Sequence, residues 1–182
     1  MRPVRLLTAA ALLAGSLASP AGAGPKLKTL GTDPAGDAPP ALDITYLQVG
    51  RTGDDLVIRI GISGMLPQTG GYPTLPGIEW VFDVGSRTFI AEAVAGTSRP
   101  AFYLFEMKDD AFEQLESPEG TYDSADGYAS ILVPLETIGA TSGTKISGTG
   151  PKGTDDVDAH VHLGPQTYYA DAMASSKDYV VP

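Results

Sequence analysis

The segment Leu56–Ser63, with the sequence LVIRIGIS, carries an aliphatic residue at every second position. A period of two is typical of a β-strand with one buried face, because successive side chains point to opposite faces of a sheet. The segment Ile78–Val84, IEWVFDV, repeats the pattern with aromatic residues at two of the inward positions. Both segments predict strands of antiparallel sheets that bury one face.

Turn residues separate these segments from their neighbours. Gly53-Asp54 predicts a hairpin that joins Ile44–Val49 to the first segment. Gly85-Ser86 predicts a second hairpin, into Thr88–Val94. Further strands are expected over Ala101–Met107, Gly127–Pro134, Lys145–Gly148, Val157–Leu163 and Asp178–Val181, with a single helical turn over Leu135–Ile138. About nine to eleven short strands with little helix predict an all-β fold, an antiparallel β-sandwich of jelly-roll or immunoglobulin-like type.

Two connections are longer than a hairpin needs. Residues 64–77 contain several prolines and glycines, so we expect an irregular surface loop there. Residues 108–126 are acidic and can hold a ragged edge strand. Neither is long enough to divide the chain, so residues 24–182 are expected to form one domain.

The N-terminal 23 residues have the features of a signal peptide. Two arginines lie within Met1–Arg5, an apolar stretch too short to span a bilayer follows, and Ala21-Gly22-Ala23 matches the small-x-small cleavage pattern. We therefore expect an exported, extracellular protein that begins near Gly24.

The composition narrows the possible partners. Without Arg2 and Arg5, the chain carries ten basic and 22 acidic residues, a net charge of −12. Such a surface repels phosphate backbones and anionic lipids, which argues against nucleic-acid and membrane partners. There is no cysteine, so burial rather than disulfides must hold the fold. We expect a monomer that binds an extracellular glycan or another exported protein.

Several short motifs, in this order, resemble a known group of secreted domains. The motifs are Asp33-Pro34-Ala35-Gly36-Asp37, Leu42-Asp43-Ile44, Asp54–Ile58, Gly77–Glu92, Ile131–Pro134 with Ile138-Gly139, and Ala170-Asp171-Ala172 with Tyr179–Val181. The chain is similar to the family-nine carbohydrate-binding modules and the DOMON domains. The resemblance implies a β-sandwich that binds a sugar, haem or a metal, or serves as an accessory domain. Sugar-binding members clamp a sugar between two tryptophans, whereas this chain has only Trp80.

The acidic N-terminal loop is a candidate Ca²⁺ site. Asp33, Asp37 and Asp43 lie within eleven residues, and Ca²⁺ takes six to eight oxygen ligands from flexible loops. The resemblance implies that Asp171, near the closing strand, lies beside this loop. The alternative is that these aspartates only form turns by bonding their own backbone amides.

The two histidines suggest a second metal hypothesis. Asp158, His160 and His162 occupy every second position of one expected strand, so they share a face and could bind Zn²⁺ or Cu²⁺. The aliphatic residues between them are expected to point into the core. We therefore expect solvated imidazoles with weak or no specific metal binding.

The aromatic residues divide into core and ligand candidates. Trp80 is in phase with Ile78 and Phe82, which predicts that it is buried. Tyr72, Tyr168 and Tyr169 fall in or beside loops and are candidates for stacking on a ligand, or else merely cover the ends of the sandwich.

Most catalytic motifs are missing from the sequence. There is no G-x-S-x-G, HExxH, phosphate-binding glycine loop or cysteine nucleophile. The sequence leaves open whether two carboxylates lie at the spacing that glycoside hydrolysis needs, because it gives no distances between side chains. We expect a non-catalytic binding or accessory module. A structural or protein-interaction domain is the first alternative and a hydrolase that uses acidic residues is the second.

Overall fold

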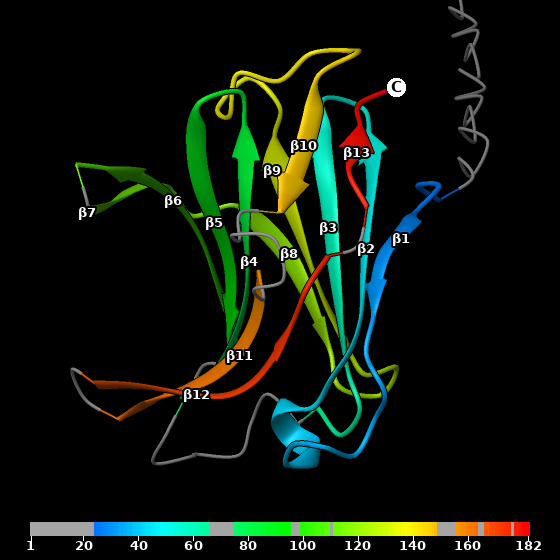
Figure 1. The fold of residues 1–182 in the computed structure, drawn as a ribbon, viewed down its shortest axis with the longest axis vertical. Helices are drawn as coiled ribbons and strands as arrows, with labels where there is room; N and C mark the ends of the chain where they lie inside the picture. Colours follow the sequence, from blue (N-terminus) through cyan, green and yellow to red (C-terminus); the bar gives the residue numbers. More distant parts are fainter. Residues whose placement is uncertain are drawn as a thin grey trace, which may run out of the picture.

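The computed structural model describes residues 24–65, 75–95, 99–109, 111–148, 156–163, 166–175 and 177–182 (Figure 1). The expected signal peptide, residues 1–23, and Tyr72 lie outside these ranges. The described part consists of strands and turns, with one 3₁₀ turn, η1 (Pro40–Leu42). Within it, no helix is long and apolar enough to cross a membrane.

The chain forms two antiparallel sheets, which confirms the predicted all-β sandwich. The first sheet has five strands in the order β1-β2-β3-β9-β8. Their bounds are Lys28–Thr32 (β1), Ile44–Thr52 (β2), Asp55–Ile62 (β3), Tyr128–Pro134 (β9) and Glu119–Asp123 (β8).

The second sheet has eight strands, and six of them follow the order β12-β11-β4-β5-β6-β7. The bounds are Gln166–Met173 (β12), Val157–Leu163 (β11), Leu75–Val84 (β4), Arg87–Val94 (β5), Ala101–Lys108 (β6) and Ala111–Glu116 (β7). The short strands β10 (Lys145–Gly148) and β13 (Tyr179–Val180) complete it. β11 and β10 share one edge of β4, because β11 pairs with its first half and β10 with its last three residues.

The core lies between the sheets and is built by the alternation seen in the sequence. Leu56, Ile58 and Ile60 of β3 are fully buried against the second sheet. Trp80 of β4 is also buried, as predicted, and its ring stacks on Phe82 at a centroid distance of 4.6 Å. With no disulfide available, this shared apolar layer is what holds the two sheets together.

The single helical turn predicted over Leu135–Ile138 is present as a hydrogen-bonded turn, which closes through the bond from Ala140 N to Leu135 O with Gly139 at φ +68°. Two other local predictions need correction. The acidic segment 108–126 holds two strands, β7 and β8, instead of one ragged strand. The described chain therefore has thirteen strands, more than the expected nine to eleven, because exposed edge strands such as β7 lack a clear apolar alternation.

The second sheet is strongly curved. In Figure 1 the β6–β7 and β11–β12 hairpins both extend to the left, away from the five-stranded sheet. The face of the eight-stranded sheet that points away from the core is therefore concave, with β4 and β5 at its floor. This curvature positions the candidate site.

Candidate functional site

A cleft of about 210 Å³ lies on the concave outer face of the eight-stranded sheet. We call it the trough. Each of the six strands from β12 to β7 contributes to its lining, which consists of Tyr169, His160, Glu79, Ile90, Glu92, Phe105 and Phe112. These residues come from widely separated parts of the chain and meet only because the strands pair in this order.

The alternation of side chains along each strand places these residues on the outer face of the sheet. Trp80 of β4 faces the core, so its neighbour Glu79 must face the trough. Glu79 is paired with Glu92 of β5 across the ladder, and Ala91 and Ala93 on either side of Glu92 are buried in the core. Two carboxylates therefore lie side by side on the outer face.

His160 completes the floor of the trough. It is only 1% exposed, and its Nε2 lies 3.0 Å from Oε1 of Glu92. Its cross-strand partner on β4 is Gly77, and a Cβ atom at that position would collide with the imidazole. A glycine within β4 thus provides the space in which the ring lies. Tyr169 of β12 covers the ring edge-on, at a centroid distance of 5.7 Å.

The floor is strongly acidic. Nitrogen and carboxylate atoms of Glu79, Glu92 and His160 all lie within 4.8 Å of one another. The pKa of Glu79 is raised to about 7, chiefly by burial; His160 opposes the shift, and the nearby charges of Glu92 and Asp158 add to it. Glu79 therefore takes up a proton near neutral pH far more readily than an ordinary glutamate does.

The rim of the trough is apolar and aromatic. Phe112 of β7 is 58% exposed and Tyr169 of β12 is 64% exposed, on opposite walls of the curved sheet. Phe105 and Ile90 lie between them along the lining. Exposed aromatic rings above buried polar groups form the usual layout of a small-molecule site.

The sequence-based expectation for the histidines is wrong for His160. We expected solvated imidazoles, but His160 is buried and bonded to Glu92. The imidazole is withdrawn from solvent because it lies in the space over Gly77 and Tyr169 packs against it edge-on. The expected group was Asp158, His160 and His162, whereas His160 gathers with two glutamates from other strands. The side chain of His162 lies outside the described residues.

The candidate tyrosines have different outcomes. Tyr169 lines the trough. Tyr168 is its neighbour on β12, but its side chain is not among those described, and Tyr72 lies outside the described ranges altogether.

The N-terminal loop brings together three of the four aspartates proposed for Ca²⁺. Carboxylate oxygens of Asp33, Asp37 and Asp171 lie within 4.8 Å of one another. Asp171 also accepts hydrogen bonds from the backbone N–H groups of Ile44, at 2.6 Å, and Ala172, at 2.9 Å. The carboxylate of Asp171 on β12 therefore ties the start of β2, where the N-terminal loop ends, to the second sheet.

Asp43 lies beside this cluster and is 1% exposed. Its Oδ2 accepts the N–H of Gly36, which lies between Asp33 and Asp37. Its Oδ1 is buried and has no hydrogen-bond partner among the described residues. A buried carboxylate oxygen without a donor is costly, and a nearby cation would relieve that cost. The turn-forming alternative explains the bond to Gly36 and leaves Oδ1 unexplained.

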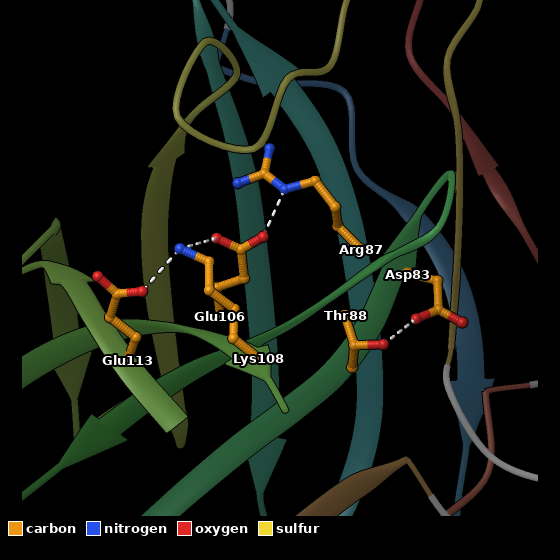
Figure 2. A network of polar contacts seen from close by, with 6 residues as sticks. All are labelled: Asp83, Arg87, Thr88, Glu106, Lys108 and Glu113. Carbon is orange, nitrogen blue, oxygen red and sulfur yellow. Dashed lines mark hydrogen bonds and ion pairs between the residues drawn. The ribbon is translucent and has the colours of Figure 1, made fainter. Parts of the chain in front are cut away.

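An ion-pair network holds the β7 wall of the trough in place. Figure 2 shows the carboxylate of Glu106 between Arg87 and Lys108. Arg87 Nε donates to Glu106 Oε1 at 2.6 Å, and Lys108 Nζ lies 3.2 Å from the other oxygen. Lys108 also bonds Glu113 of β7 at 2.6 Å, so the network links β5, β6 and β7 on the side facing away from the trough.

The sequence alone did not single out Glu79 and Glu92 as site residues, although their positions in the strands were unusual. Each is an acidic residue with an apolar residue on either side, and each falls in the outward phase next to core residues. Gly77, two residues before Glu79, marked a close approach by another group. What the sequence lacked was the pairing that places β11 beside β4.

Comparisons with protein-family models, curated proteins and solved structures found no match. The resemblance to the family-nine carbohydrate-binding modules and DOMON domains therefore stays a prediction.

Proposed function

We propose that this protein is an exported, non-catalytic binding module that holds its ligand in the trough. The observation that carries the proposal is the convergence of six strands on one cleft, with buried polar groups at its floor and exposed aromatic rings at its rim. A purely structural sheet face would not need two glutamates and a histidine withdrawn from water, because burying such groups is costly.

A sugar residue is the ligand class that fits this arrangement best. The carboxylates of Glu79 and Glu92 accept hydrogen bonds from hydroxyl groups, and the Tyr169 and Phe112 rings offer apolar faces for the C–H side of a sugar ring. A volume of about 210 Å³ is below that of a typical drug-sized pocket and suits one small ring of a longer chain. In this proposal Tyr169 and Phe112 replace the tryptophan clamp, since Trp80 is in the core.

We further propose that Ca²⁺ bound by Asp33, Asp37 and Asp171 is a structural ion. The cluster lies where the N-terminal loop meets β12, so an ion there would fix one end of the trough wall. Asp43 would contribute by holding the loop through Gly36 and by facing the added positive charge.

A glycan array followed by titration calorimetry tests the sugar proposal. We expect binding to at least one glycan, and we expect Tyr169→Ala and Phe112→Ala each to weaken it by about 1–3 kcal/mol, as loss of a contact residue does. Tyr128→Ala is a matched control, because Tyr128 lies on β9 of the other sheet, beneath Arg59. An array without binding, or an equal loss in Tyr128→Ala, contradicts the proposal.

A hydrolase is the second candidate, and one observation favours it. Burial raises the pKa of Glu79 to about 7, as a general acid at a glycosidic bond requires, and a second carboxylate, that of Glu92, lies beside it. Release of reducing sugar from a bound glycan, lost in Glu79→Gln, would replace the binding proposal with this one.

The protein-interaction alternative rests on β7. This strand is an exposed edge, and its Phe112 presents a large apolar side chain to solvent. An edge of this kind can pair with a strand of another protein. Co-purification of an exported protein that is lost in Phe112→Ala but kept in Tyr169→Ala would favour this alternative over sugar binding.

A further inference from the structure

The floor of the trough gathers acidic side chains around one imidazole. Within the described chain, the outward side chains of β4, β5, β6 and β11 include Glu79, Glu92, Asp83 and Asp158 but no lysine or arginine. Arg87 and Lys108 lie on the other face, where they are paired with Glu106. Two carboxylates beside an imidazole nitrogen are ligand types that transition-metal ions accept, so this face is suited to a bound cation.

The geometry of the cluster fits a single ion. The three groups come from three adjacent strands, Glu79 from β4, Glu92 from β5 and His160 from β11, and their ligand atoms lie within 4.8 Å of one another. His160 Nε2 and Glu92 Oε1 are 3.0 Å apart. Two ligands at about 2.0–2.1 Å from a tetrahedral Zn²⁺ are separated by about 3.3 Å, so a small adjustment would let the ion replace that contact.

We propose that Glu79, Glu92 and His160 form a binding site for a divalent transition-metal ion of the Zn²⁺ class at the floor of the trough. Gly77 keeps open the space in which the imidazole lies. The cleft gives access to the cluster from the solvent side, so a water molecule or a ligand group can take the fourth position.

The donor set separates this ion from the Ca²⁺ proposed for the N-terminal loop. Zn²⁺ and its neighbours accept an imidazole nitrogen together with two carboxylates. Ca²⁺ prefers six to eight oxygens, which the three aspartates and the carbonyl groups of a loop are better able to supply. The zinc proposal does not rest on sugar binding, because the three ligand atoms lie together without a sugar in the cleft.

Zinc titration of the purified protein tests the proposal. The protein is first stripped with a chelator and then titrated with ZnCl₂ in excess Ca²⁺, so that the aspartate cluster does not compete. We expect one Zn²⁺ per chain with submicromolar affinity. His160→Ala should weaken binding at least about 100-fold, which is more than loss of an outer-shell residue costs.

The two histidines provide an internal control. If Zn²⁺ binds in the trough, His162→Ala should leave its affinity unchanged. If it binds instead to Asp158, His160 and His162 along β11, both His160→Ala and His162→Ala should lose affinity. Glu79→Gln keeps the side-chain shape, so it serves if His160→Ala fails to fold, and it should weaken binding at least about tenfold. Circular dichroism checks that each variant is folded.

Cobalt gives a second readout that a structural role would not produce. Four-coordinate Co²⁺ absorbs visible light much more strongly than hydrated Co²⁺. The strong bands should form with one equivalent of Co²⁺ in the wild type and His162→Ala, and should need a higher Co²⁺ concentration in Glu79→Gln. Absence of stoichiometric Zn²⁺ binding by the wild type would overturn the proposal and leave a buried His160–Glu92 pair. Equal loss in His162→Ala would also overturn it.

Discussion

Trp80 Nε1 donates a hydrogen bond to Oδ2 of Asp156 at 2.8 Å, across 76 positions of the chain. The same carboxylate accepts from the hydroxyl and the backbone N–H of Ser175. Asp156 directly precedes β11, and Ser175 follows β12. The tryptophan at the centre of the core therefore also anchors the β11–β12 hairpin that forms one wall of the trough.

Two substitutions at Trp80 separate its packing from its hydrogen bond. Trp80→Ala should lower the free energy of unfolding by about 3–5 kcal/mol, because it leaves a large cavity. Trp80→Phe keeps a ring against Phe82 and removes the donor, so about 1–3 kcal/mol is expected. Urea denaturation measures both. No loss in Trp80→Phe would mean that the bond to Asp156 contributes nothing beyond packing, and native fluorescence like that of free tryptophan would mean that the ring is not buried.

Glu106 should make stability depend on pH in the acid range. Its hydrogen bond to Arg87, assisted by Lys108, lowers its pKa from 4.5 to about 2. The native state thus binds this proton less tightly than the unfolded chain does, so the network stabilises the fold above about pH 4.5 and the contribution is lost as the pH falls toward 2.

The variant Glu106→Gln tests this pH dependence. The difference in free energy of unfolding between wild type and variant should shrink steadily from pH 5 to pH 2. Glu113→Gln, at the exposed end of the same network, should show a much smaller change. A difference that stays constant over this range would show that Glu106 acts by packing alone.

Calcium should raise the melting temperature if the aspartate cluster binds it, because an ion that binds only the native state stabilises it by mass action. We expect a rise in millimolar Ca²⁺, reversal by a chelator, and loss of the effect in Asp37→Asn. Asp37 is the exposed member of the cluster, so its substitution disturbs the fold least. Asp54→Asn, an exposed acid in the β2–β3 turn, is the matched control. Identical melting midpoints with and without Ca²⁺ would show that these aspartates only form turns.

Gly77→Ala should disturb the trough without changing any polar group. The added Cβ would collide with His160, so the ring must shift, and overpacking of this kind costs about 1–3 kcal/mol. We expect a lower melting temperature together with weaker Zn²⁺ binding. Gly24→Ala is the control, because a Cβ atom there meets no neighbouring atom. Unchanged melting and affinity in Gly77→Ala would show that the ring does not need this space.

The fold was predictable because its signal is local. The alternation in Leu56–Ile62 and Ile78–Val84 states which side chains are buried, and turn residues such as Gly53 and Gly85 mark the hairpins. Edge strand β7 was harder, because an exposed strand has no buried face to impose a pattern. Part of the aspartate cluster was predictable from the sequence, because Asp33 and Asp37 are close together in the chain. Asp171 was expected there only from the family resemblance.

The trough could not be predicted, because its floor depends on strand order. Glu79 and Glu92 face each other through a hairpin, but His160 reaches them only because β11 pairs with β4. Alternation along β11 assigned His160 correctly to the outer face. It gave no information on whether that face is covered, which depends on the curvature of the whole sheet.

Chemical-shift mapping tests most directly whether the trough is the binding site. The isotope-labelled protein is titrated with the strongest glycan from the array while amide shifts are followed. We predict that the largest changes fall on β4, β5, β11 and β12 around Glu79, Glu92 and Tyr169, and that they vanish in Tyr169→Ala. Changes centred on the outer face of the five-stranded sheet, around Arg59 and Tyr128, would contradict the account.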